Sequence, residues 1–481
     1  MSNIKFYIAS ALAGLLISGC STLSTVGDAV SGLNPFDNDD DQGEAIDDPN
    51  RISILELSES LVVTGALQPS DVVLPDPRLQ NDWVQSGGNA THTMQRLTSD
   101  GSLEKAWTKD FGKGSSNKGR IVAPPVIQGD RLFVMDANNN VQALNADGGS
   151  RIWQYKVKIN ETGKTRKGRK SLFERVKDPL SFRDSGGVDK HGVGGGLSVI
   201  DDVVYVTSGL GVIEALNATT GDSIWRRELR VPLHSAPVVK DGRLFAITDD
   251  NELYALNAIT GDTQWTYQGI VESARMLTLP APAVVDEVVI APFSSGELVA
   301  LRVQNGGVLW QDSLSGGGRL TPLASLNDIA SGPVIADGFV IASAQSGAMN
   351  AFDLRTGQRI WSQPAGTLSF PWVAGDFVYA ATTNGEIICM SKLDGQLVWL
   401  TQLDTYKNEK KRKNKVFWSG PILVDDKLVV FSSQGVGMEL NPFDGSVIRE
   451  FKAGQGVFVP PVFANGTLYV VSDGAKLTAY R

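Results

Sequence analysis

A turn followed by a tryptophan recurs through most of the chain, and this repeat restricts the possible folds more than any other feature. Its pattern is an alanine, an Asn or Asp two residues later, a glycine turn, and a tryptophan four residues after the glycine. The clearest copies are residues 143–153, 215–225 and 255–265. From Trp225 to Trp399, successive tryptophans of the repeat lie 38 to 51 residues apart. Repeats of about 40 residues are typical of β-propeller blades, so the sequence predicts a propeller.

Each unit of the repeat divides into four short expected strands. In the unit that ends at Trp265, these are residues 236–239, 243–247, 252–256 and 263–265. They are rich in Val, Ile, Leu and aromatic residues, which favour strands. Asp-Gly pairs and Asn residues between them supply the positive φ that tight hairpins need. Because no stretch shows a sustained helical period, the expected fold class is all-β.

The two ends of the repeat set the number of blades. Seven units carry their own fourth strand, and these strands end near Trp153, Trp225, Trp265, Trp310, Trp361, Trp399 and Ile448, with Ile448 in the tryptophan position of its unit. The final unit, residues 461–481, has only three expected strands. Residues 101–107 supply the fourth, with Trp107 in the repeat position. We therefore expect an eight-bladed propeller of four-stranded antiparallel blades, closed by an N-terminal strand that completes the last blade.

The tryptophans of the repeat admit two interpretations. A row of aromatic side chains can stack on sugars, but a fixed place after each turn favours docking between neighbouring blades, where a large flat ring fills the wedge. We assign this structural role to Trp107, Trp153, Trp225, Trp265, Trp310, Trp361 and Trp399.

The N-terminus has the features of an export signal. A lysine precedes an apolar run over residues 6–17, which is too short to span a bilayer as a mature helix. A glycine and Cys20 follow, and this junction resembles the bacterial lipobox. The resemblance implies that residues 1–19 are removed as a lipoprotein signal peptide and that Cys20 carries lipid; ordinary secretion, with Cys20 an incidental thiol, is the alternative. By resemblance to lipoprotein sorting signals, Ser21 after the cysteine favours the outer membrane.

The composition changes after the export signal. Acidic residues concentrate between positions 37 and 48, and apolar residues are few there. We therefore expect residues 20–100 to form a lipidated N-terminus and a mostly flexible tether. The propeller is expected over residues 101–481.

Side chains that usually carry catalysis are sparse. His92, His191 and His234 are far apart in the sequence, and none lies at ligand spacing from a cysteine or a carboxylate pair. Cys389 lies in an apolar run and is expected to be a buried small hydrophobe rather than a nucleophile. The net charge of −9 argues against a general nucleic-acid binder. We expect no catalytic residue, no metal and no cofactor, and hence a binding protein rather than an enzyme.

The tryptophan repeat resembles the docking repeat of quinoprotein dehydrogenases, and that of a family that shares their propeller without the cofactor. With the lipobox and the acidic tether, the chain resembles the BamB family, lipoproteins of the outer-membrane β-barrel assembly (BAM) machinery. The resemblance implies a non-enzymatic scaffold, anchored at the outer membrane and facing the periplasm. It also implies binding to the POTRA domains of BamA and assistance in the folding and insertion of β-barrel proteins. Whether nascent outer-membrane proteins are also bound directly is left open.

The same resemblance implies contact residues for BamA. They lie in two loops, residues 273–279 and 316–330, each of which precedes the first strand of a blade. The implied contacts are Arg275, Met276, Leu277 and Asp328. The second loop departs from the family pattern of two nearby acids, because an isoleucine and an alanine follow Asp328.

Two other functions remain as alternatives. A quinone-dependent dehydrogenase would use the same repeat, but such enzymes usually carry an adjacent cysteine pair and calcium-binding acids, and the chain has no adjacent cysteines. A glycan-binding propeller would instead use exposed aromatic residues outside the repeat, such as Trp372 or Trp418.

Two loops are rich in Lys and Arg, residues 158–196 and 406–415. Such runs either form mobile, solvated loops or contact anionic lipid head groups or an acidic partner surface.

Overall fold

The computed structural model describes residues 60–99, 101–159, 192–229, 231–271, 280–314, 328–345 and 347–481. Residues 58–481 form one compact unit. Within the described ranges the secondary structure is β, apart from a single turn of 3-10 helix, η4 (Pro69–Asp71). None of the described residues belongs to a helix with the length and apolar character that crossing a membrane requires.

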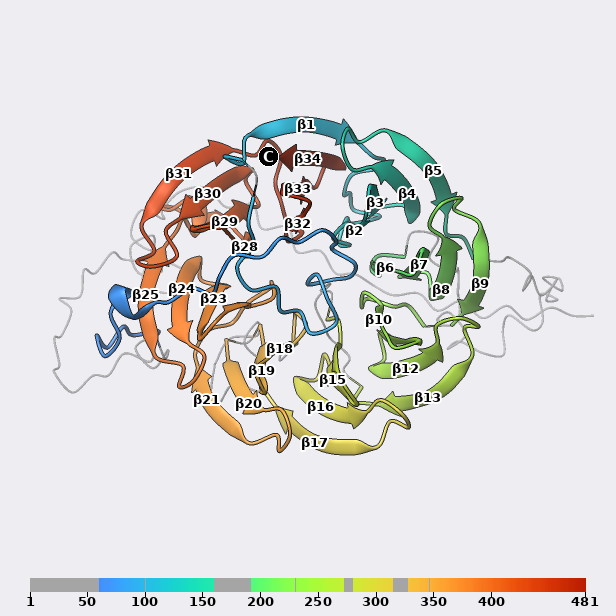
Figure 1. Ribbon diagram of the computed structural model, residues 1–481, viewed down its shortest axis with the longest axis horizontal. Coiled ribbons are helices and arrows are strands. Elements are labelled where there is room, and N and C mark those ends of the chain that lie inside the picture. Colours follow the sequence, from blue (N-terminus) through green and yellow to red (C-terminus); the bar gives the residue numbers. More distant parts are fainter. Residues whose placement is uncertain are drawn as a thin grey trace, which may run out of the picture. The chain divides into compact units, whose positions relative to one another are not determined.

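Eight four-stranded antiparallel sheets stand in a ring as the blades of a propeller, which confirms the predicted fold (Figure 1). From the centre outward, the strands of blades 1 to 4 are β2 (Val126–Gln128), β3 (Arg131–Met135), β4 (Asn140–Asn145), β5 (Arg151–Lys156); β6 (Leu197–Ile200), β7 (Val203–Ser208), β8 (Val212–Asn217), β9 (Ser223–Glu228); β10 (Val238–Lys240), β11 (Arg243–Ile247), β12 (Glu252–Asn257), β13 (Thr263–Gln268); and β14 (Ala283–Val285), β15 (Val288–Pro292), β16 (Glu297–Arg302), β17 (Val308–Ser313).

Blades 5 to 8 follow the same order. Their strands are β18 (Val334–Ala336), β19 (Phe339–Ser343), β20 (Met349–Asp353), β21 (Arg359–Gln363); β22 (Trp372–Ala374), β23 (Phe377–Ala381), β24 (Glu386–Ser391), β25 (Leu397–Gln402); β28 (Trp418–Val424), β29 (Lys427–Ser432), β30 (Val436–Leu440), β31 (Val447–Lys452); and β32 (Val462–Ala464), β33 (Thr467–Val471), β34 (Lys476–Tyr480), β1 (Lys105–Asp110). A separate two-stranded hairpin, β26 (Tyr406–Asn408) and β27 (Lys413–Lys415), lies between β25 and β28.

The ring closes in blade 8, where β1 meets the last strand of the chain, β34. Strand β1 pairs antiparallel with β34, and Trp107 lies opposite Ala479. The backbone N–H of Arg481 donates to the carbonyl of Glu104 at 2.8 Å. The N-terminal strand therefore completes the last blade, as the repeat predicts.

A tryptophan on the outermost strand packs on a glycine turn of the next blade at seven of the eight junctions, and at six of them its indole N–H also donates a hydrogen bond; Trp107, which packs on Gly149, is the exception. At the first junction, the indole Nε1–H of Trp153 donates to the carbonyl of Ala218 at 2.9 Å. The ring lies over Gly221, where an added Cβ would come within 2.7 Å of it. Gly221 also has a φ of +79°, so the turn needs glycine for its backbone and for its close contact with the ring. The other five donor and acceptor pairs, at 2.7 to 3.0 Å, are Trp225–Ala258, Trp265–Val303, Trp310–Leu354, Trp361–Lys392 and Trp399–Pro442.

The junction between blades 7 and 8 lacks a tryptophan, and the residue in its place is Arg449 rather than Ile448. Arg449 pairs with Glu439 in the register in which Trp265 pairs with Ala255. Ile448 is 51% exposed and precedes this position. The assignment of Ile448 to the tryptophan position is therefore wrong by one residue.

Arg449 contacts both sides of this junction. Its guanidinium pairs with Glu439 at 2.5 Å within blade 7, with the carboxylate of Glu104, and at 3.5 Å with the carbonyl of Leu103. The tryptophans elsewhere donate to the turn between the third and fourth strands of the next blade. Blade 8 has no such turn, because its third and fourth strands, β34 and β1, come from opposite ends of the chain. The charged side chain bonds instead to the segment that leads into β1.

Residues 80–97, called the inner belt here, run around the centre of the ring (Figure 1, blue). The sequence places them in the tether, whereas the structure packs them into the propeller. The belt makes a hydrogen bond with the first strand, or the turn after it, in every blade. In order around the ring, the pairs are Gln80–Asn465, Trp83–Ile127, Val84–Val199, Gln85–Val239, Ala90–Val284, Thr91–Ile335, Gln95–Gly375 and Leu97–Leu423, at 2.7 to 3.1 Å.

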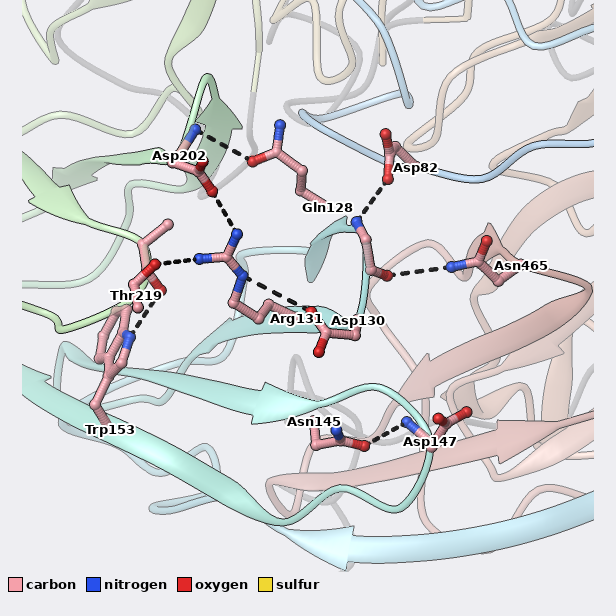
Figure 2. A network of polar contacts seen from close by, with 12 residues as sticks. Asp82, Gln128, Asp130, Arg131, Asn145, Asp147, Trp153, Asp202, Thr219 and Asn465 are labelled. Carbon is pink, nitrogen blue, oxygen red and sulfur yellow. Dashed lines mark hydrogen bonds and ion pairs between the residues drawn. The ribbon is translucent and has the colours of Figure 1, made fainter.

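Polar side chains strengthen the belt where blades 8, 1 and 2 meet (Figure 2). Asp82 of the belt accepts a hydrogen bond from the backbone N–H of Gly129 at 2.7 Å, and the carbonyl of Gly129 accepts one from Asn465 at 3.2 Å. Arg131 of blade 1 pairs with Asp202 of blade 2. Gly129 and Asn465, which both bond to the belt, therefore also bond to each other between blades 1 and 8.

Candidate functional site

The propeller has two faces with different kinds of loop. In a four-stranded antiparallel blade the first and third strands run in one direction and the second and fourth in the other. The connections from one blade to the next therefore emerge on one face, called the connection face here. The turns between first and second strands emerge on the opposite face, called the turn face, and the belt bonds near them. In the sequence, the two segments expected to contact BamA, residues 273–279 and 316–330, join blade 3 to blade 4 and blade 4 to blade 5.

The structure describes only part of the predicted contact set. Arg275, Met276 and Leu277 lie outside the described residues, as does the predicted lipidation site, Cys20. Asp328 is described and is 3% exposed. Its backbone carbonyl accepts a hydrogen bond from the N–H of Gln345 at 2.9 Å. Asp328 thus lies under the connection face, where its side chain is not presented to solvent.

A central cavity of about 220 Å³ lies between the belt and the connection face. Apolar residues that precede or begin the first strands of five blades line it, together with belt residues such as Trp83 and His92. The rings of Trp83 and Trp372 stack with centroids 6.4 Å apart. None of the residues that line the cavity is an Asp, Glu, Lys or Arg. The cavity therefore suits neutral, apolar groups.

His92 is the one titratable side chain of the cavity lining. Its Nδ1 lies 2.7 Å from the carbonyl of Pro333 and donates to it, because a carbonyl can only accept. Desolvation by burial lowers its pKa to about 4, although the bond to Pro333 acts in the opposite direction. The imidazole is neutral near pH 7. The sequence indicated only that His92 has no potential metal ligand at the usual spacing, and nothing in that spacing signals burial in the belt.

The residues present do not fit a quinone cofactor. A quinone of the quinoprotein type carries several carboxylates and is held beside calcium, so its site needs cationic and acidic side chains. The central cavity has neither in its lining. The described residues also contain no cluster of three His, Cys, Asp or Glu side chains that could hold a metal ion. Cys389 is buried in β24, and burial raises the pKa of its thiol, which disfavours the reactive thiolate.

The two aromatic residues named for a glycan-binding propeller are not exposed. Trp372 is 8% exposed and Trp418 is 7% exposed. Their indole N–H groups donate to the backbone carbonyls of Gln95 and Asp404, at 2.8 and 3.1 Å. Both rings are therefore part of the packing between the blades, the belt and the loops.

Comparison with known proteins decides the family. The family model described as outer membrane protein assembly factor BamB matches residues 80–189 and 183–401, which is more than half of the chain. The chain belongs to the BamB family. The matched region starts at the first residue of the inner belt and extends into blade 6.

Curated relatives extend this result to most of the chain. The BamB protein of Moranella endobia is 26% identical over 382 residues, which cover 78% of this chain and 89% of the relative. The BamB protein of Escherichia coli is 27% identical over 378 residues, with coverage of 78% and 88%. Each carries the name outer membrane protein assembly factor BamB.

Solved structures establish the fold alone, because their sequence identities are low. BamB from Moraxella catarrhalis matches with a TM-score of 0.60 at 18% identity, covering 79% of this chain and all of that chain. Quinohemoprotein alcohol dehydrogenase from Comamonas testosteroni matches with a TM-score of 0.61 at 13% identity, covering 83% and 80%. The propeller therefore does not separate the BamB family from the quinoproteins; the family match and the uncharged cavity do.

Proposed function

We propose that this chain is a non-enzymatic assembly factor for outer-membrane proteins that works by binding and positioning its partners. The family match over residues 80–401 is the observation that carries the proposal. The cavity lining supports it, because a site with no charged side chain offers little to a cofactor of the quinoprotein type. The scaffold is held at the outer membrane by lipid on Cys20 and faces the periplasm.

The proposed partner is BamA, bound through its POTRA domains at the connection face. Residues 272–279 follow blade 3 and residues 315–327 follow blade 4, so the two loops leave the ring at adjacent junctions of one face. A partner can therefore engage both at once. Arg275, Met276 and Leu277 are the proposed contacts, since a basic residue beside two large apolar residues is a composition found at interface hot spots. Asp328 is buried, so it is proposed to hold the end of the second segment in place rather than to contact BamA directly.

Recovery of BamA with the affinity-tagged chain from a lipoprotein-competent host tests this proposal. The variant Met276→Glu with Leu277→Glu changes the first loop, and Ile259→Glu with Ile448→Glu is the matched control, because Ile259 and Ile448 are exposed outside the connection face. We expect BamA recovery to fall at least about tenfold for the loop variant and to stay unchanged for the control. Equal recovery with the loop variant would remove this loop from the interface. Absence of BamA with the wild-type chain would overturn the proposed function.

The lipid anchor needs a separate experiment. Cys20→Ser is expected to abolish incorporation of a labelled fatty acid and to release the protein from the membrane fraction, because no other group in the proposal holds it there firmly. Labelling that persists in Cys20→Ser would contradict the assignment of Cys20.

A further inference from the structure

The basic segment that follows blade 6 forms an ordered hairpin. Strands β26 and β27 pair antiparallel, with Tyr406 opposite Lys415 and Asn408 opposite Lys413. Below them, the N–H of Val416 donates to the carbonyl of Thr405 at 2.8 Å. The segment is therefore a defined projection from the connection face, which is called the basic hairpin here (residues 406–415).

The basic hairpin concentrates positive charge on an acidic protein. Its six cationic side chains are exposed, and they are Lys407, Lys410, Lys411, Arg412, Lys413 and Lys415. With its single acid, Glu409, the hairpin carries a formal charge of +5, whereas the whole chain carries −9, so the remainder carries −14. A local charge of opposite sign to the rest of the molecule favours an anionic partner at this place.

The protein itself does not neutralise these cations. The carboxylate of Glu409 accepts hydrogen bonds from the backbone N–H groups of Thr405 and Tyr406, at 3.0 and 2.7 Å, and so holds the base of the hairpin. Among the described residues, no salt bridge joins any of the six cations to a carboxylate. Lys415 instead has its ammonium 5.7 Å from the ring of Phe417. The charge is therefore available to a partner outside the described structure.

The side chains of the hairpin distinguish a lipid surface from a protein partner. Five of the six cations are lysines, which are strongly hydrated point charges without the planar fork of arginine. Protein interfaces are depleted in lysine and are centred on buried aromatic or apolar anchors. No large exposed hydrophobic residue lies within residues 406–415. Such a surface fits a diffuse layer of negative charge better than a specific pocket.

We infer that the basic hairpin binds the anionic phospholipid head groups of the membrane to which the protein is anchored. It would set the orientation of the propeller by bringing the edge formed by blades 6 and 7 to the lipid surface. The hairpin joins blades 6 and 7, whereas the second proposed BamA segment joins blades 4 and 5. Because the two use different junctions, binding of lipid does not exclude binding of BamA. The attraction acts over about one Debye length, roughly 10 Å at 0.1 M salt, and the lipid anchor keeps the hairpin near the membrane. This inference rests on the proposed membrane location.

Vesicle binding by the full mature chain carrying Cys20→Ser tests the inference, since that variant leaves only the protein surface to bind lipid. The probes are vesicles of phosphatidylethanolamine and phosphatidylcholine, with or without phosphatidylglycerol, at low and high salt. We expect binding only to the vesicles with phosphatidylglycerol, and weaker binding at high salt. Adding Lys410→Gln, Lys411→Gln and Lys413→Gln is expected to weaken binding at least about tenfold. The matched control, Lys105→Gln, Lys109→Gln and Lys156→Gln, removes three exposed lysines from the outermost strands of blades 8 and 1, away from blades 6 and 7, and is expected to bind as before.

Three results would overturn the inference. These are equal binding by the hairpin variant and its parent, equal binding of the parent to both kinds of vesicle, and no binding of the parent to either. If vesicles are not bound and the hairpin variant loses BamA in the recovery experiment, the anionic partner is a protein. If vesicle binding fails while wild-type BamA recovery persists, the proposed function stands without this inference. Matching thermal unfolding curves for the three chains show that the substitutions preserve the fold.

Discussion

The outer and inner rims of the propeller are held together in different ways. On the outer rim, a tryptophan packs on a glycine turn of the next blade at seven junctions, and at six of them its indole N–H also donates a hydrogen bond. On the inner rim, one segment without any repeat bonds to all eight blades in turn. The comparison teaches that the repeat determines the contacts between neighbouring blades on the outer rim, whereas the inner rim is held together by residues outside the repeat.

The outer-rim contact is altered at both junctions of blade 8. At the junction into blade 8, Arg449 occupies the tryptophan position and forms ion pairs with Glu104 and Glu439. At the junction out of blade 8, Trp107 is present, but its Nε1–H has no hydrogen-bond partner among the described residues. The hydroxyl of Tyr469 donates to the carbonyl of Ala146 instead, at 3.1 Å. The belt crosses the junction out of blade 8, whereas its two ends lie at blades 7 and 8 and leave the junction between these two blades to Arg449.

Removing an outer-rim tryptophan is expected to have the largest effect on stability. Trp361→Ala deletes a ring that is 7% exposed, together with its bond to Lys392, and should lower the free energy of unfolding by about 3–5 kcal/mol. Urea unfolding at neutral pH measures this. Ile360→Ala is the matched control, because Ile360 is 43% exposed and its loss should cost less than about 1 kcal/mol. A loss for Trp361→Ala as small as that of its control would contradict the docking role.

The inner rim is expected to weaken in acid. The pKa of His92 is about 4 in the folded protein and has its ordinary value near 6.5 in the unfolded chain. Between these values only the unfolded chain takes up the proton, so stability falls as the pH drops through this window, by up to about 3 kcal/mol. Unfolding by urea at about pH 7 and about pH 4.5 measures the change.

His92→Asn separates this effect from general acid unfolding. Asparagine tolerates the φ of +59° at this position and cannot be protonated in this range. We expect the variant to lose less stability between the two pH values than the wild type. If His92→Asn shows the same pH dependence as the wild type, His92 does not make the inner rim sensitive to acid.

The charged contact at the closing junction is expected to contribute less than a buried tryptophan. Arg449→Met leaves the carboxylate of Glu439, which is 2% exposed, with Lys427 at 3.4 Å as its remaining cation. The free energy of unfolding should fall by about 1–3 kcal/mol. Adding Glu439→Gln removes the uncompensated charge and should recover part of the loss. A double variant that is no more stable than the single one would show that packing, rather than charge, holds this junction.

The smallest expected effect distinguishes two tryptophans of the same repeat. Trp310→Phe loses the bond from Nε1 to Leu354, at 2.8 Å, and should cost about 1 kcal/mol or more. Trp107→Phe loses no such bond among the described residues and should cost about half as much or less. Thermal unfolding of both variants side by side is the measurement. Equal losses would mean that the indole N–H contributes little on the outer rim.

The blades were predictable because their determinants are local. Alternating apolar residues, Asp-Gly turns and the tryptophan lie within each unit, and the observed strands β10 to β13 match the expected strands of that unit closely. Ile448 was assigned to the tryptophan position because it is apolar, whereas the residue four positions after Gly445 is Arg449. The inner belt was not predictable, because its bonds follow no repeated sequence pattern. Each joins a different belt residue to a different blade.

The candidate site was predictable only in part. The sequence did not predict the central cavity, because its lining comes from the belt and from five blades that are far apart in the chain. Sequence patterns did not predict the burial of His92 or of Asp328, because burial there depends on residues more than two hundred positions away or on loop packing. The basic hairpin was visible as a run of lysines, but its pairing of Tyr406 with Lys415 follows only from the structure.

The inner belt also sets an order of events in folding. It is synthesised before every blade to which it bonds, and its partners extend from Ile127 to Asn465. Contacts between residues so distant in the chain form slowly, because closing long loops is entropically unfavourable. The belt can therefore make its full circuit only after the last blade has been synthesised and placed. A fully bonded belt marks a finished ring, and a truncated or misassembled propeller would reveal itself by leaving residues 80–97 open to proteases.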